Sequence, residues 1–244
     1  MKKKIKAILK FSPIFLYEYY RNTKNEIKRN KNSQELINQY FQKPGKKRLQ
    51  IGCGNNFLKG WLNTDINGLE GTVYLDAGRK FPFENDSFDI IYSEHLFEHL
   101  SLEEQMSMLG EAKRVLKNGG VLRIATPSID FLFDLYSNPN SAKNLTYTNW
   151  ARNTVPKLKT VPKTIGKESF HVYVVNNFFR DWGHKMIHNF ESIKGLTKGF
   201  NFTAVKEVEV GESVHEDLRN VEQHGKIIPE HINKWETMVI EITK

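Results

Sequence analysis

The stretch Leu49-Gln-Ile-Gly-Cys-Gly-Asn55 decides the fold, because a short apolar run passes directly into a turn that holds two glycines. Such a run, bounded by glycine, is typical of a buried strand that leads into a tight turn. Gly52 and Gly54 have no Cβ, so a ligand can come close to the backbone of this turn. The stretch therefore predicts a first strand with a ligand site at its carboxyl end.

Six further segments have strand-like patterns, and together with the first they predict an α/β fold. We expect these strands over residues 61–66, 72–75, 88–92, 120–125, 203–210 and 236–243. Ser101 and Glu104 form a capping box that starts a helix between the fourth and fifth strands. Apolar strands separated by a helix favour a parallel sheet covered on both faces. We expect the last strand to be antiparallel, because residues 211–235 show no clear crossover helix.

The segment 136–168 differs from the rest of the chain. It is rich in Asn, Lys, Thr, Ser and Pro and shows little periodicity, so we interpret it as a surface insertion or lid. Helices are expected around residues 174–182 and 190–197. The predicted organisation is a basic arm, residues 1–47, followed by a main domain, residues 48–244, with the insertion at about 136–182.

Acidic residues follow two of the predicted strands. Asp65 ends the second strand and Asp76 follows the third, so both are expected at the carboxyl edge of the sheet, where ligands of open α/β sheets bind. A carboxylate can accept hydrogen bonds from the two hydroxyls of a ribose or from an exocyclic amine. With the glycine turn on the first strand, these acids predict a nucleoside site.

Over about residues 48–127 the sequence resembles the class I S-adenosylmethionine-dependent methyltransferases, in particular their small-molecule branch in bacteria. The stretches that carry this resemblance are Leu49–Asn55, Leu75–Ala77, Phe81–Asp89, Ser93–Leu100 and Leu116–Leu122. The resemblance implies a Rossmann-like, seven-stranded, mostly parallel sheet with helices on both faces and a reversed last strand. It also implies a set of cofactor-binding residues: Gly52, Cys53, Gly54, Asn55, Asp65, Ile66, Asp76, Ala77, Ser93 and Glu94.

The expected reaction is methyl transfer from S-adenosylmethionine, which leaves S-adenosylhomocysteine. We expect O-methylation of a small polar acceptor, such as a saccharide or a cell-envelope precursor, by resemblance. A hydroxyl acceptor needs a base, and a histidine with a near-neutral pKa suits that role. His184, which follows the predicted helix stop at Trp182-Gly183, is the first candidate for a catalytic residue, and His95 is the second.

Two other function classes stay open. One is a non-catalytic module that keeps the fold and binds a partner. The other is a nicotinamide-dependent oxidoreductase, which the turn does not favour because a third glycine is replaced by Asn56. Only eight residues, Cys53 to Gly60, separate the first two predicted strands. The first crossover helix is therefore expected to shrink to a turn or two, which leaves little support for a pyrophosphate.

The stretch His95-Leu-Phe-Glu-His99 spells H-x-x-E-H, a pattern found in one class of zinc peptidases. Here it begins directly after a predicted strand rather than within a helix. No Asp/His cluster elsewhere in the sequence completes a site. We therefore expect no catalytic metal.

The net charge of +8 is concentrated in the arm. Residues 1–48 hold 14 Lys and Arg against three acids, so the rest of the chain is slightly acidic. The main domain is therefore not expected to bind nucleic acid, because it lacks a basic face. A single cysteine, the lack of a recognisable cleaved signal sequence and the lack of a run of ~20 apolar residues predict a cytoplasmic protein.

The arm itself predicts an interaction with an anionic membrane surface through residues 1–30. Lysines and arginines flank aromatic and aliphatic residues there, and each cation near an anionic leaflet contributes on the order of 1 kcal/mol. Packing of the aromatic residues on the main domain and RNA binding are the alternatives. The full chain is expected to sediment with anionic but not neutral vesicles, to be released by high salt, and to lose binding when residues 1–30 are deleted. Equal sedimentation of the truncated chain would contradict the predicted interaction with the membrane.

Overall fold

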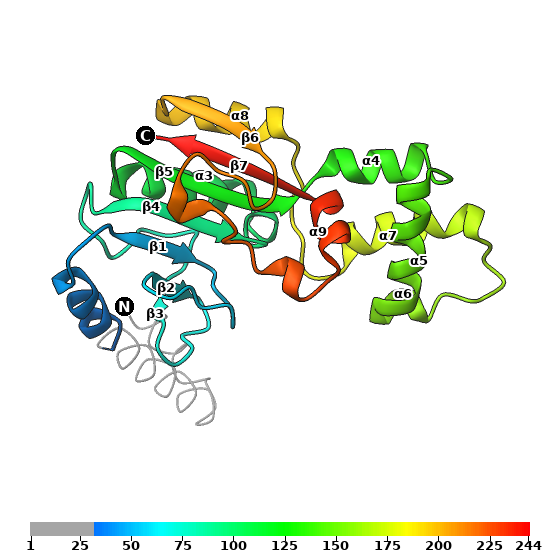
Figure 1. Ribbon diagram of the computed structural model, residues 1–244, viewed down its shortest axis with the longest axis horizontal. Helices are drawn as coiled ribbons and strands as arrows, with labels where there is room; N and C mark the ends of the chain where they lie inside the picture. The colour runs from blue at the N-terminus through cyan, green and yellow to red at the C-terminus, as the bar shows by residue number, and fades with distance from the viewer. Residues whose placement is uncertain (1–31) are drawn as a thin grey trace, which may run out of the picture.

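The computed structural model describes residues 32–244 and contains one seven-stranded sheet with the order β3-β2-β1-β4-β5-β7-β6 (Figure 1). β1 to β5 are parallel, whereas β7 lies antiparallel between β5 and β6. The predicted α/β fold with a reversed last strand is therefore confirmed. The strands are β1 Arg48–Ile51, β2 Leu62–Asp65, β3 Val73–Tyr74, β4 Phe88–Glu94, β5 Leu116–Pro127, β6 Ala204–Val208 and β7 Thr237–Thr243.

One face of the sheet is covered by helices. These are α3 (Leu102–Val115), α8 (Phe190–Thr197) and a helix at 32–42, and they share a large apolar core with the strands. The capping box at the start of α3 is present, because Ser101 Oγ accepts from the Glu104 N–H and Glu104 Oε2 accepts from the Ser101 N–H. The helix at 32–42 lies within the predicted arm, whereas residues 1–31, which carry the membrane prediction, lie outside the described residues.

The other face is covered mainly by the segment 211–226, which forms only short 3₁₀ turns, η3 (Glu216–Leu218) and η4 (His224–Lys226). Leu218 and Val221 of this segment pack on β4 and β5 in a smaller core. Residues 52–61 form turns and contain no helix, whereas the short spacing predicted a helix of a turn or two. The segment 211–226 thus covers a face that the shortened first crossover leaves open.

The insertion is helical, which the sequence did not predict for residues 136–168. It consists of α4 (Ile129–Ser137), α5 (Ala142–Thr154), α6 (Pro156–Lys159) and α7 (Lys167–Arg180), with a core of its own. The reason lies in α5, whose buried face includes Asn144 and Thr148 beside Tyr147 and Ala151. A helix that buries polar side chains shows no apolar periodicity in its sequence.

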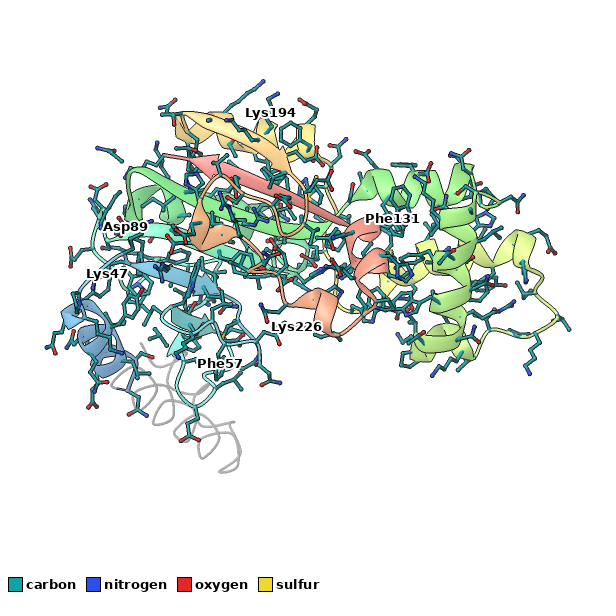
Figure 2. All side chains as sticks on the ribbon, in the orientation of Figure 1. Lys47, Phe57, Asp89, Phe131, Lys194 and Lys226 are labelled. Atoms are coloured by element: carbon teal, nitrogen blue, oxygen red, sulfur yellow. The ribbon has the colours of Figure 1, made fainter. Side chains whose placement is uncertain are left out.

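The insertion lies beyond the carboxyl ends of the parallel strands (Figure 1). It is joined to the sheet through α9 (Glu230–Glu236), which leads directly into β7. Phe131 of α4 contacts Trp235 of α9, with ring centroids 5.7 Å apart, and Figure 2 shows it between the two elements. Within residues 32–244, none of the helices is long and apolar enough to cross a membrane.

Candidate active site

The glycine turn after β1 is fastened to the end of β2 by Asp65. Its Oδ2 accepts a hydrogen bond from the Gly54 N–H at 2.9 Å, and its Oδ1 accepts one from the Asn67 N–H at 2.8 Å. The carboxylate is buried, at 6% exposure, yet an ionised carboxylate has about four acceptor positions. Asp65 therefore shapes the turn and can still accept further hydrogen bonds from a ligand.

The two glycines of the turn have different reasons to be glycine. Both have positive φ angles, +69° at Gly52 and +49° at Gly54. A Cβ on Gly52 would lie 2.9 Å from Leu96 Cδ2, whereas a Cβ on Gly54 would meet no atom within 4 Å. Gly52 is thus required for packing against Leu96. The open side that was predicted for a ligand is at Gly54.

The remaining predicted cofactor residues stand at the ends of β2, β3 and β4. Asp76 follows β3, and its two oxygens bind the Gly78 N–H and Arg79 Nε, each at 3.0 Å. Ile66 is 53% exposed and Ala77 is buried. Ser93 pairs with Ile51 in the sheet, so β4 ends beside the glycine turn. Cys53 and Asn55 belong to the turn itself, and burial raises the pKa of the Cys53 thiol to about 12.

Glu94, the last residue of β4, has a role that the sequence did not reveal. Its carboxylate accepts hydrogen bonds from the backbone N–H groups of Gln223 and His224, each at 2.9 Å. It therefore fastens the end of the segment 211–226 over the edge of the sheet and fixes the position of His224.

A cavity of about 430 Å³ lies between this edge of the sheet and the helical insertion. It is lined by the turn after β4, by helices of the insertion and by the segment that leads into β7. The lining residues are His95, Glu98, His99, Pro127, Trp150, Thr154, Val155, Pro156, Phe178, Trp182, His184, His224, Ile227, Ile228 and Glu236. Both predicted catalytic residues, His184 and His95, are among them.

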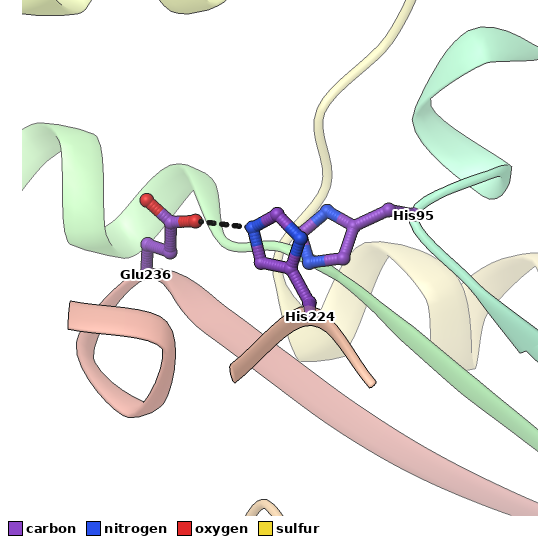
Figure 3. A group of neighbouring side chains, drawn as sticks. All are labelled: His95, His224 and Glu236. Atoms are coloured by element: carbon purple, nitrogen blue, oxygen red, sulfur yellow. Dashed lines mark hydrogen bonds and ion pairs between the residues drawn. The ribbon is translucent and has the colours of Figure 1, made fainter. Parts of the chain in front are cut away.

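His95 and His224 form a stacked pair in this cavity (Figure 3). Their ring centroids are 3.9 Å apart and the planes are inclined by 38°. Each ring has its own carboxylate: His95 Nδ1 lies 3.2 Å from Glu98 Oε1, and His224 Nε2 lies 3.2 Å from Glu236 Oε1. Burial lowers the pKa of His95, but the Glu98 carboxylate outweighs this effect and leaves that pKa above its ordinary value.

His184 lies on the other side of Glu98, beside His99. The two rings are 5.0 Å apart in an edge-to-face arrangement. His184 Nδ1 is 2.8 Å from the carbonyl oxygen of Phe178, so this nitrogen carries the proton and donates it. Burial lowers the pKa of His184, which keeps the ring neutral near pH 7 with Nε2 as an acceptor.

The H-x-x-E-H stretch does not bring its two histidines together. Residues Phe97–His99 form a one-turn 3₁₀ helix, so His95 faces His224 while His99 faces His184. However, the prediction of no metal also assumed that no distant residues complete a site. Within residues 32–244, two groups of side chains have ligand atoms that all lie within 4.8 Å of one another, so distant residues do meet there, and the absence of a catalytic metal stays a prediction. The groups are His95, His224 and Glu236, and Glu98, His99 and His184.

Comparison with known proteins agrees with this architecture. A family model described as "Methyltransferase domain" matches residues 67–124, which include β3, β4, α3 and most of β5. An uncharacterized protein of Haemophilus influenzae is 34% identical over 83 residues, which span 30% of this chain and 33% of that protein.

Solved structures with similar folds include an S-adenosylmethionine-dependent methyltransferase from Archaeoglobus fulgidus, at 21% identity and a TM-score of 0.48, covering 93% of this chain and 100% of that chain. Another, from Thermotoga maritima, is described as a possible histamine N-methyltransferase, at 14% identity and a TM-score of 0.43, covering 93% of this chain and 99% of that chain. Residues 67–124 match a methyltransferase domain, and the order and directions of the seven strands are those of the Rossmann-like class I methyltransferase fold.

Proposed function

We propose that this chain transfers a methyl group from S-adenosylmethionine to a hydroxyl group of a small acceptor. The observation that carries this proposal is the position of His95. It directly follows β4, whose last residues stand beside the glycine turn, and it also lines the cavity. A cofactor over the strand ends and an acceptor in the cavity would therefore meet at this residue.

The cofactor is assigned to the edge formed by β1 to β4. Gly54 leaves an open approach to the turn, Asp65 offers acceptors for the ribose hydroxyls, and Asp76 offers acceptors for the adenine amine. A nicotinamide dinucleotide fits less well, because residues 52–61 provide no helix N-terminus for its pyrophosphate.

The acceptor is assigned to the cavity, whose volume lies within the usual range of about 300–1,000 Å³ for small-molecule sites. Trp150, Trp182 and Phe178 offer flat apolar walls, while the histidines and Glu236 offer hydrogen-bonding groups. This mixture suits a ring with hydroxyl substituents, and a saccharide or another cell-envelope precursor remains our proposal for it.

Chemistry in the cavity requires that the hydroxyl oxygen attack the sulfonium methyl group in line while it loses its proton. Positioning in the cavity supplies much of the acceleration of such a displacement. His184 is the proposed base, because its Nδ1 donates to the Phe178 carbonyl and its Nε2 is left to accept a proton. His95 lies at the end of the cavity nearest the proposed cofactor site. We propose that it helps to position the acceptor.

Asp65→Ala is expected to weaken binding of S-adenosylmethionine by about 1.5–3 kcal/mol, the range for hydrogen bonds to a charged group. Titration calorimetry with S-adenosylmethionine and S-adenosylhomocysteine measures this. Asp130→Ala is the matched control, because Asp130 is exposed on α4 and far along the chain from the turn. Tight binding of NADH with none of S-adenosylmethionine would contradict the proposal, and cofactor binding without turnover of any hydroxyl acceptor would favour a non-catalytic module.

A further inference from the structure

We propose that His95, His224 and Glu236 form a binding site for one divalent transition-metal ion at the wall of the cavity. Two imidazole nitrogens and one carboxylate oxygen lie within 4.8 Å of one another there. Two histidines and a carboxylate form a donor set that holds such ions while leaving positions open for another ligand. This proposal goes beyond methyl transfer and does not depend on it.

Outer contacts orient two of the three donors. His95 Nδ1 is bonded to Glu98 Oε1, so the nitrogen that would meet an ion is Nε2, which lies 3.4 Å from the Thr237 hydroxyl and would give up that contact. Glu236 Oε2 accepts a hydrogen bond from the hydroxyl of Tyr147, while Oε1 faces His224. A carboxylate on the far nitrogen of a ligand histidine, and a donor on a ligand carboxylate, are the usual supports of protein metal sites.

The backbone also holds the donors in place. His95 has a φ of +47°, an uncommon conformation for a residue with a side chain. Glu94, next to it, binds the N–H of His224 and so links the two histidine-bearing segments. The contact that fastens the segment 211–226 over the sheet edge thus also brings the two histidines together across about 130 residues of sequence.

The neighbouring group of Glu98, His99 and His184 is a weaker candidate. Glu98 has no exposed side-chain surface, and both of its oxygens are engaged, Oε1 by His95 and Oε2 by the Thr126 hydroxyl at 3.0 Å. Oε1 of Glu236, in contrast, contacts His224, which belongs to the same proposed site, so an ion would replace that contact without breaking a hydrogen bond to a residue outside the site. An ion held by His95, His224 and Glu236 would also face the part of the cavity proposed for the acceptor. There it would favour loss of a proton from a bound hydroxyl.

The rival arrangement is a pair of stacked histidine–glutamate contacts without an ion. The centroid distance of 3.9 Å fits such a stack, and an ion would take the place of the direct contact between His224 and Glu236. The two arrangements differ in their response to added metal, because only the proposed site binds one ion tightly.

Titration of the chelator-treated full chain with Co²⁺, followed by visible absorption and calorimetry without S-adenosylmethionine, tests the proposal. We expect one equivalent to bind with the spectrum of nitrogen-ligated Co²⁺, and Zn²⁺ to displace it. His224→Ala and Glu236→Gln should abolish tight binding, while Glu98→Gln should weaken it by about 10–100-fold as a loss of outer support. His231→Ala, exposed on the same helix as Glu236, should bind as the unaltered chain does.

Absence of stoichiometric Co²⁺ binding would overturn the proposal. Binding that survives in His224→Ala and Glu236→Gln but disappears in His99→Ala would also overturn it, by moving the ion to the neighbouring group. Circular dichroism and thermal melting of each variant show whether it is folded. Glu236→Gln is chosen because the amide can still bond to the hydroxyl of Tyr147. Because no cofactor or acceptor is present, failure here leaves the methyl-transfer proposal unaffected.

Discussion

Arg123→Met is expected to lower the free energy of unfolding by about 3–5 kcal/mol, the usual cost of breaking a buried ion pair from one side. The Arg123 side chain has no exposed surface. Its Nη2 lies 2.6 Å from Glu222 Oε1 in the segment 211–226, and its Nη1 lies 2.6 Å from Glu241 Oε1 on β7. Its Nη1 also donates to the Glu212 carbonyl. Without the guanidinium, two buried carboxylates lose their partner.

Urea denaturation followed by circular dichroism measures this loss. Arg219→Met is the matched control, because Arg219 is exposed in the same segment and donates to the Ser213 carbonyl rather than to a buried carboxylate. Removing the acids as well, in Arg123→Met/Glu222→Met/Glu241→Met, should recover much of the stability, since it removes the uncompensated charges. A single Arg123→Met variant as stable as the unaltered chain would mean that this network does not hold the segment 211–226 on the sheet.

His184→Ala is expected to lower kcat by about 10²–10⁴-fold, the range attributed to a positioned general base. The effect should fall on kcat more than on cofactor affinity, because His184 lines the cavity and not the glycine turn. Turnover of S-adenosylmethionine with a reactive acceptor measures it, and His231→Ala is the control. An unchanged rate in His184→Ala would show that another group, or none, removes the proton.

The pH dependence of the same reaction gives a second measure. Burial lowers the pKa of His184, so its neutral, proton-accepting form persists at pH values where an ordinary histidine is already charged. The rate should therefore stay on its plateau as the pH falls through ~6.5, the ordinary histidine pKa, and decline only at lower pH. A decline centred above that value would contradict the assignment of the base to His184.

Local patterns were sufficient to predict the sheet but not the cavity. The apolar runs that precede Gly52 and Asp65 carry their strand signal within a few residues, and the strand order follows from the class of fold. His224 and Glu236 become neighbours of His95 only through tertiary contacts, and no local pattern marks either residue as its partner. Similarly, the helix α5 was missed because its buried face includes Asn144, which accepts from Trp235 Nε1.

The glycine turn gives a second example of a feature that the sequence alone could not predict. The sequence predicted that Gly52 and Gly54 both admit a ligand, because both lack a side chain. The structure separates them, since Leu96 fills the space beside Gly52. The identity of the packing partner, 44 positions away, could not be predicted from the turn alone.

The separate core of the helical insertion divides the molecule into parts that can change independently. The strands that end at the cofactor edge contribute to the main core, for example through Ile51 of β1 and Leu62 of β2. Trp150, Phe178 and Trp182, which line the cavity proposed for the acceptor, belong to or border the insertion. Substitutions in α5 and α7 can therefore reshape the acceptor side without disturbing the glycine turn or Asp65. A lineage that keeps the sheet and exchanges these helices would acquire new acceptors while it retains one cofactor, and laboratory evolution of acceptor range should begin in these two helices.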